Sequence, residues 1–114
     1  MDWIRSWHIY RDPEMSIIVR YKDMLDDTLD IVTRVAEHFE LDSRRETIQS
    51  IVTANSFEKL SGGRKRGDTD NKSFFRSGTS GNWKICLTSE LNELYKDIIG
   101  EFLIEFGYEK DKSW

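Results

Sequence analysis

Cysteine is almost absent from this sequence, since Cys86 is the only one in 114 residues. A single thiol excludes both an internal disulfide framework and a multi-cysteine zinc site. Long apolar runs are also missing, and the N-terminal residues contain no apolar stretch of signal-peptide length. We therefore expect a cytoplasmic protein without a membrane segment or an export signal.

The size of the chain allows one ordinary hydrophobic core. A protein of 13.5 kDa buries roughly two thirds of its unfolded surface, which leaves no room for a second core. Charged residues make up 33% of the sequence and aromatic residues 12%. This aromatic content is typical of a folded chain and argues against a disordered one.

Positive charge is concentrated in one segment. Residues 62–84 contain six basic and two acidic side chains, a net charge of +4, whereas the whole chain has −4, which leaves −8 for the rest. A basic, glycine-bearing loop on an acidic protein is typical of a site for one small anion. Nucleic acid is therefore the weaker alternative, and it predicts an affinity that falls steeply with salt.

Hydrophobic spacing predicts one strand among three helices. The β-branched run SIIVRY follows a turn-forming Asp-Pro pair and indicates a strand over 16–21, and helical spacing of apolar residues indicates helices over 27–40, 44–54 and 88–106. A lone strand has no partner for its backbone hydrogen bonds, and a buried strand followed by helices is usual in α/β domains. We therefore interpret the chain as a mostly helical C-terminal part of a larger α/β domain, ending in a frayed tail.

A long loop over 61–82 separates the second and third predicted helices. Structureless loops above about 12–15 residues are uncommon unless they bind something or are disordered. Within it, Arg76 offers a guanidinium fork, Gly78 allows close backbone approach, and Ser77 adds a hydroxyl. Together these groups are suited to phosphate recognition. The basic triplet 64–66 is interpreted as solvated surface or as part of a loop that closes over a ligand.

Residues 74–88, FFRSGTSGNWKICLT, also resemble a known motif. This motif is RKGxxGxWK, near the C-terminus of the sulfotransferases that use 3′-phosphoadenosine 5′-phosphosulfate (PAPS), whose Arg, Lys and first Gly grip the 3′-phosphate. The matching residues are Arg76, Gly78, Gly81, Trp83 and Lys84. Ser77 stands where the family has Lys, so one cation of the phosphate site is replaced by a hydroxyl.

Three further stretches resemble the same family in the same order. RYKDML at 20–25 is similar to the family's YEDL element and implies that Tyr21 lies near the adenine. NSFEKL at 55–60 is similar to the TSF element and implies that Phe57 borders the purine, a role that the neighbouring loop also suggests for Phe75 in place of ordinary packing. The KxxxTVxxxE dimer motif of cytosolic members is matched by Lys84, Thr88 and Glu93, which implies a homodimer.

The resemblance implies a fold and a cofactor. The fold is the C-terminal portion of a P-loop-like sulfotransferase domain of the α/β class, covering residues 1–114, with 61–82 as its cofactor loop. The cofactor is PAPS, whose product is adenosine 3′,5′-bisphosphate, and the acceptor in the complete enzyme is a small molecule with a hydroxyl or an amine. The site residues implied are Tyr21, Phe57, Phe75, Arg76, Ser77 and Gly78.

No catalytic residue is assigned in this sequence. The family's phosphosulfate loop and catalytic histidine have no counterpart here, and His8 and His38 are interpreted as surface or packing residues. Asp68 and Asp70 have no third oxygen ligand patterned near them, so no metal site is expected. We expect the chain alone to be inactive. The alternative is a catalytically inactive, sulfotransferase-like interaction module.

Overall fold

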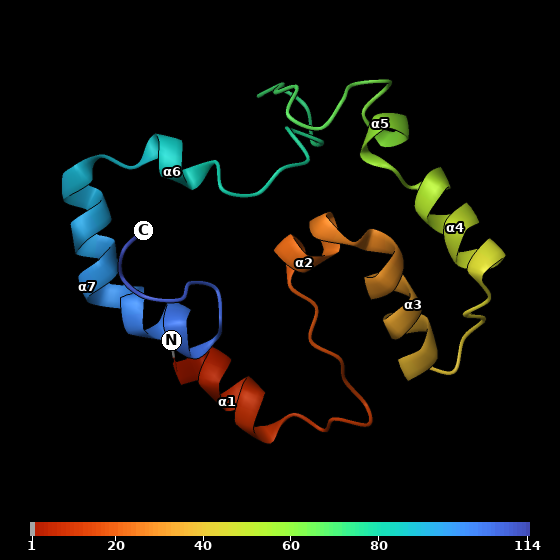
Figure 1. The fold of residues 1–114 in the computed structure, drawn as a ribbon, viewed down its shortest axis with the longest axis horizontal. Coiled ribbons are helices and arrows are strands. Elements are labelled where there is room, and N and C mark those ends of the chain that lie inside the picture. Colours follow the sequence, from red (N-terminus) through yellow and green to blue (C-terminus); the bar gives the residue numbers. More distant parts are fainter. Residues whose placement is uncertain (1) are drawn as a thin grey trace. The chain divides into compact units, whose positions relative to one another are not determined.

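The computed structural model describes residues 2–114, and within this range the regular structure is helical (Figure 1). Irregular segments join the helices, and no strand is assigned among the described residues. None of these helices is both long enough and apolar enough to span a membrane. The helices are α1 (Asp2–Tyr10), α2 (Tyr21–Asp26), α3 (Thr28–His38), α4 (Arg45–Ala54), α5 (Phe57–Leu60), α6 (Trp83–Cys86) and α7 (Ser89–Glu105).

The strand predicted over 16–21 is not present in the described chain. Residues 16–20 are irregular, and α2 already begins at Tyr21. The backbone at Arg20 is extended, with φ −89° and ψ 137°, but a strand also needs a neighbouring extended segment to bond with. Arg11 holds this segment instead, because its Nη1 donates to the carbonyl of Ser16 at 3.0 Å.

The chain divides into two compact units. One, here termed the loop unit, comprises Ile9–Ser80 and includes the helices from α2 to α5. The other, here termed the C-terminal unit, combines the described residues up to His8 with Gly81–Trp114. Each unit has its own set of contacts.

The core of the loop unit lies where α3 packs against α4. Ile31 and Ala36 of α3 and Ile48 of α4 are buried, with at most 6% of each residue exposed. The helix α3 begins after Asp27, whose carboxylate accepts a hydrogen bond from the Asp30 amide at 2.9 Å. This N-cap satisfies one of the free amides of the first turn and fixes where α3 starts beside α2.

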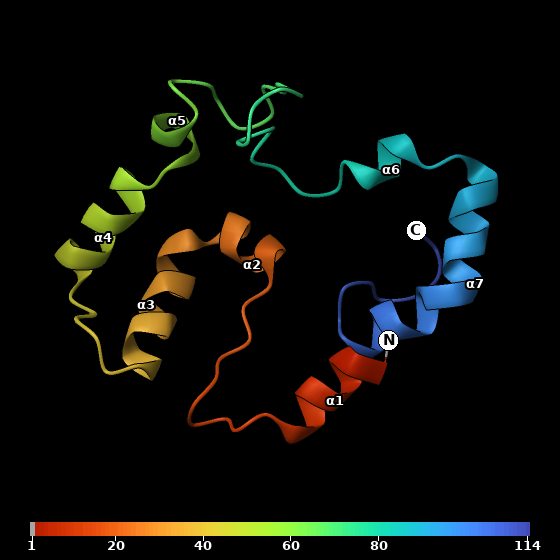
Figure 2. The same cartoon turned by 180° about the vertical axis from the view of Figure 1, so that it is seen from behind.

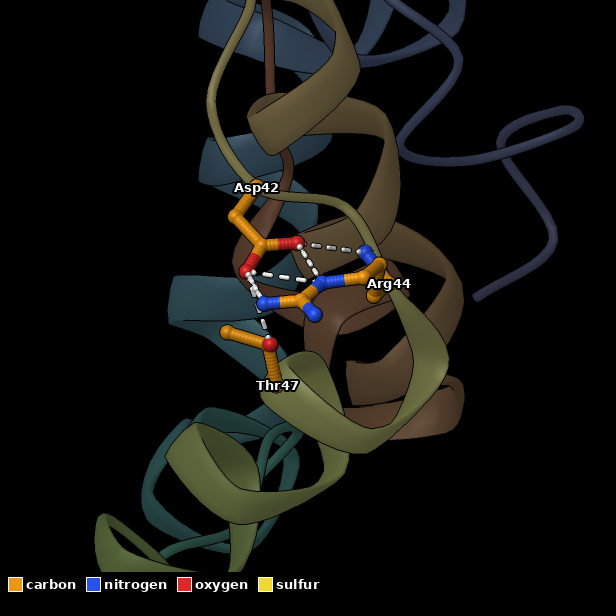
Figure 3. A network of polar contacts seen from close by, with 3 residues as sticks. All are labelled: Asp42, Arg44 and Thr47. Carbon is orange, nitrogen blue, oxygen red and sulfur yellow. Dashed lines mark hydrogen bonds and ion pairs between the residues drawn. The ribbon is translucent and has the colours of Figure 1, made fainter.

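A polar network sets the start of α4 (Figure 3). The N-cap residue, Arg44, has no side-chain cap of its own, and Asp42 replaces it from two residues upstream. The Asp42 carboxylate accepts from the Arg44 amide at 3.0 Å, from the Arg44 Nη2 at 2.7 Å and from the Thr47 hydroxyl at 2.9 Å. These hydrogen bonds lower the pKa of Asp42 well below its usual range, and the bond from the Arg44 guanidinium has the largest effect.

In the C-terminal unit, α1 is attached to the end of α7. Arg5 of α1 forms an ion pair with Glu105 at 2.7 Å, and the ring of His8 packs edge-on against Phe106 at 4.4 Å. The hydrogen bond from Arg5 lowers the pKa of Glu105. Phe102, with 8% exposed, is the buried aromatic residue of α7. Contacts far apart in sequence therefore hold this unit together.

The C-terminal tail folds back beside α7 (Figures 1 and 2). The Trp114 ring packs edge-on against Trp83 at 5.1 Å, and its carbonyl accepts a hydrogen bond from Asn92 at 3.3 Å. Lys112 forms an ion pair with Glu101 at 2.8 Å. The expectation of a frayed tail is therefore wrong, because an apolar contact ties the tail to α6 and polar contacts tie it to α7.

Candidate functional site

The loop over 61–82 is compact although it has no regular structure. Two backbone hydrogen bonds cross it: the Gly67 amide donates to the carbonyl of Ser77 at 2.8 Å, and the Asp70 amide donates to that of Arg76 at 3.0 Å. These bonds bring the first basic residues of the loop next to the predicted phosphate-binding residues. The part of the loop up to Ser80, which belongs to the loop unit, is thus folded on itself.

The guanidinium of Arg76 is available to a ligand. Arg76 is exposed, and no described residue gives its side chain a hydrogen bond or an ion pair. Its neighbour Ser77 is different, since only 4% of it is exposed and its hydroxyl lies 3.1 Å from that of Thr79. The Ser77 hydroxyl therefore makes a contact within the loop, whereas the Arg76 guanidinium is a cation that no described residue binds.

Gly78 packs directly against Phe57. Its φ is +63°, and a Cβ built on it would lie 2.5 Å from Cδ2 of the Phe57 ring. Phe57 is held at this place because it opens α5, whose N-cap Ser56 accepts a hydrogen bond from the Lys59 amide at 3.4 Å. The structure therefore brings together two predicted site residues that are 21 positions apart. Only glycine fits both the backbone angle and the space.

Phe75 and Tyr21 are less closely connected to this cluster. The Phe75 ring packs edge-on against Phe74 at 5.2 Å, and Phe74 is 94% exposed. Tyr21 opens α2 and is 53% exposed, and within residues 2–114 no hydrogen bond or ring contact joins it to Phe57 or Phe75. The end of α2 is nevertheless tied to the loop.

That tie is made by Arg66, the last residue of the basic triplet 64–66. Nη1 of Arg66 donates to the carbonyl of Leu25 at 3.0 Å, which connects the loop to α2. Arg64, interpreted from the sequence as solvated surface or as part of a closing loop, donates to several acceptors inside the loop. Sequence reasoning missed this role, because a run of three basic residues carries no signal that tells an exposed cation from one that folds back onto carbonyls.

The residues of the predicted dimer motif all have contacts within the C-terminal unit. The Lys84 ammonium lies 5.2 Å from the centre of the Trp83 ring, and the Thr88 hydroxyl caps α7 by accepting from the Leu91 amide at 3.3 Å. Glu93 forms an ion pair with Lys96 at 2.9 Å. The homodimer remains a prediction.

The histidines make packing contacts. His8 lies against Phe106, and His38 lies edge-on to Phe39 at 4.7 Å. Among residues 2–114, no three His, Cys, Asp or Glu side chains gather to hold a metal ion. An open groove of about 590 Å³ runs along α4 and α5, and the residues that line it are Arg45, Glu46, Gln49, Ser50, Thr53, Ala54 and Lys59. None of the six predicted site residues lines this groove.

Comparison with known proteins decides the family. The family model of the sulfotransferase domain matches residues 1–107. The chain belongs to the sulfotransferase family. Among its curated relatives, a flavonol 4′-sulfotransferase from Flaveria chlorifolia is 32% identical over 108 residues, and cytosolic sulfotransferase 4 from Arabidopsis thaliana is 34% identical over 108 residues. An amine sulfotransferase from Oryctolagus cuniculus is 24% identical over 119 residues.

These alignments cover most of the sulfotransferase chain but only part of each relative. They include 83%, 92% and 92% of this chain and 34%, 36% and 38% of the three relatives, respectively. The chain therefore spans a little more than a third of their length. No solved structure matches it.

Proposed function

We propose that this chain is the C-terminal part of a sulfotransferase domain and forms the 3′-phosphate and adenine half of its PAPS site. The observation that supports this most is the free, exposed guanidinium of Arg76 beside Gly78, which packs on Phe57. Family membership supports a sulfuryl donor. The same motif that carries the resemblance thus contains a cation that no described residue neutralises.

Each residue of the cluster has a physical role in this proposal. The Arg76 fork donates charge-assisted hydrogen bonds to the 3′-phosphate. Gly78 offers its backbone amide to the phosphate, while the Phe57 ring packs where a Cβ would lie. Phe57, Phe75 and Tyr21 offer aromatic surface to the adenine, and Ser77 shapes the turn through its hydrogen bond with Thr79.

The reaction proposed is that of the family. PAPS supplies the sulfuryl group, and adenosine 3′,5′-bisphosphate is left as product. The acceptor is a small molecule with a hydroxyl or an amine, which agrees with the flavonol and amine named for two relatives. In-line transfer also needs cations on the moving group and a base for the acceptor's proton, and no described residue is assigned to either task. We therefore expect the chain alone to be inactive.

The remaining proposals rest on the relatives. The name of the Arabidopsis relative supports a cytoplasmic location, and the match of Lys84, Thr88 and Glu93 to the family's dimer motif supports a homodimer. The second candidate function is an inactive sulfotransferase-like interaction module. Exposed apolar side chains favour it, since Trp3, Trp7 and Ile98 are 72%, 59% and 63% exposed.

The decisive experiment compares Arg76→Ala with Lys72→Ala by isothermal titration. Both variants lose one exposed loop cation, but only Arg76 lies in the proposed site. Loss of a charge-assisted contact of about 1.5–3 kcal/mol should weaken adenosine 3′,5′-bisphosphate about ten- to a hundredfold in Arg76→Ala. Adenosine 5′-phosphate, which lacks the 3′-phosphate, should lose no affinity. If Arg76→Ala binds adenosine 3′,5′-bisphosphate as tightly as the wild-type chain does, the proposed site is refuted. If the wild-type chain binds neither nucleotide, the interaction module is the only candidate function that is left.

A further inference from the structure

The guanidinium of Arg64 is bound to four separate acceptors of the loop. Its Nη1 donates to the carbonyls of Asp68 at 3.0 Å and Arg76 at 3.1 Å. Its Nη2 donates to the hydroxyl of Ser73 at 2.9 Å and to the carbonyl of Phe75. The acceptors lie between 4 and 12 positions away in sequence. One side chain therefore fixes the course of most of the loop.

Only an arginine can make this set of contacts. The guanidinium presents five N–H donors in a rigid planar fork, so two of its nitrogens can serve acceptors on different sides. A lysine ammonium has the same charge, but it places all its donors on one nitrogen. The contacts depend on the shape of the Arg64 head group as well as on its charge.

The same guanidinium also reaches the aromatic part of the site. Its central carbon lies 5.5 Å from the centre of the Phe57 ring, a distance at which a cation is attracted to the face of an aromatic ring. Gly78 packs against this ring as well. Arg64 is thus linked to Arg76 through a carbonyl and to Gly78 through Phe57.

The guanidinium groups of Arg64 and Arg76 differ in what they contact. Arg64 is partly buried and donates to three carbonyls and one hydroxyl, whereas Arg76 is exposed and its guanidinium has no partner among the described residues. The carbonyl of Arg76 is held from two sides, by Arg64 and by the Asp70 amide. The backbone that carries the Arg76 side chain is therefore fixed before any ligand arrives.

We infer that Arg64 is a positioning residue, which holds the loop so that Arg76 and Gly78 face the 3′-phosphate of an adenine nucleotide. This inference rests on the proposed function. Arg64 contacts no nucleotide itself but acts through the carbonyls of Phe75 and Arg76. Because these groups are already fixed in the free chain, nucleotide binding does not have to bear the entropic cost of ordering them.

The test uses Arg64→Lys in the full chain, with Lys65→Ala as the control. Lys65 is exposed, and the side-chain nitrogen of Lys65 bonds to no described residue, so Lys65→Ala removes a loop cation without touching the Arg64 contacts. Arg64→Lys keeps the charge and loses the fork. We expect it to weaken adenosine 3′,5′-bisphosphate about tenfold by isothermal titration. Adenosine 5′-phosphate should be unaffected, whereas general destabilisation would weaken both nucleotides.

Two further measurements separate positioning from folding. The double variant Arg64→Lys with Arg76→Ala should bind no more weakly than Arg76→Ala alone, because both changes remove one function. The amides of Gly67 and Asp70, which donate across the loop, should exchange with solvent faster in Arg64→Lys. If Arg64→Lys folds poorly, Ser73→Ala can be used in its place. It removes one of the four acceptors, and we expect smaller changes of the same kind in nucleotide affinity and amide exchange.

The outcomes distinguish the two proposals. Arg64→Lys with wild-type nucleotide selectivity and wild-type amide exchange overturns the inference. A wild-type chain that shows no preference for the bisphosphate overturns the proposed function and the ligand half of the inference. Amide exchange then still decides whether Arg64 orders the loop.

Discussion

Gly78 is the residue at which backbone and packing requirements coincide. Its φ of +63° lies in the left-handed region, and the Phe57 ring occupies the space of a Cβ. Gly62 has a similar φ of +76° but nothing within 4 Å of its Cβ position. The two glycines therefore separate the cost of the backbone angle from the cost of the contact.

We predict that Gly78→Ala destabilises the chain more than Gly62→Ala. Each substitution should cost about 1 kcal/mol for the left-handed backbone. Gly78→Ala should add about 1–3 kcal/mol, because the new methyl group overlaps the Phe57 ring. Urea unfolding followed by circular dichroism measures both values. Equal losses of unfolding free energy in the two glycine variants would contradict the packing described. The same holds if adding Phe57→Ala to Gly78→Ala restores no stability.

The internal contacts of the candidate site could not be predicted from the sequence. Arg76 is expected to face a ligand because its guanidinium fork lies beside Gly78; it is exposed, and its role at a phosphate stays a prediction. Ser77 was expected at the ligand, but it is buried with its hydroxyl on Thr79. The role of Arg64 depends on four acceptors spread over 68–76, and a linear pattern cannot show which carbonyls a long side chain reaches.

At the scale of the elements, local polar contacts decide where helices begin. Asp27 and Thr88 cap α3 and α7, and Asp42 performs the same task for α4 from outside the helix (Figure 3). Asp42 is exposed, so its contribution depends on its charge and on the hydrogen bonds that this charge strengthens. Acid should therefore weaken the start of α4.

The pH dependence follows from the lowered pKa of Asp42. A carboxylate whose folded-state pKa is depressed stabilises the fold above its unfolded pKa, about 3.9, and loses this contribution as pH falls through the folded pKa. Thermal unfolding between neutral and acid pH should show Asp42→Asn with a smaller loss of stability on acidification than wild type. Asp26→Asn is the control, because no described residue bonds to the Asp26 carboxylate. Equal acid responses of Asp42→Asn and wild type would refute the role of Asp42.

Apolar spacing predicted the main helices within a few residues, although much of the α7 stripe is exposed, with Leu94 at 51% and Ile98 at 63%. The expected ranges 27–40, 44–54 and 88–106 correspond to Thr28–His38, Arg45–Ala54 and Ser89–Glu105. The strand over 16–21 failed because β-branched residues favour extended backbone but cannot supply a partner strand. The helix α1 was not predicted, and its anchor, the ion pair of Arg5 with Glu105, joins residues 100 positions apart.

At the scale of the molecule, large apolar side chains remain exposed in both units. In the C-terminal unit Trp3, Trp7 and Ile85 are 72%, 59% and 86% exposed, and in the loop unit Phe74 is 94% exposed. The chain covers 34–38% of three curated relatives. We propose that these faces pack against the rest of a sulfotransferase domain.

We predict that replacing Trp3 and Trp7 together by Gln leaves the thermal midpoint unchanged, since neither ring is buried in this chain. The same double variant should bind less of the apolar dye anilinonaphthalene sulfonate. Trp114→Gln should instead lower the thermal midpoint, because the Trp114 ring packs on Trp83 and losing this contact should cost about 1 kcal/mol of stability. A lower midpoint for the Trp3 and Trp7 variant would show that these rings already support the fold.

The division into two units also determines what an optical signal can report. All four tryptophans, Trp3, Trp7, Trp83 and Trp114, belong to the C-terminal unit, whereas the proposed nucleotide site belongs to the loop unit. Indole fluorescence therefore follows the melting of one unit alone. If the units melt separately, adenosine 3′,5′-bisphosphate should delay the loss of backbone ellipticity and leave the fluorescence transition where it was.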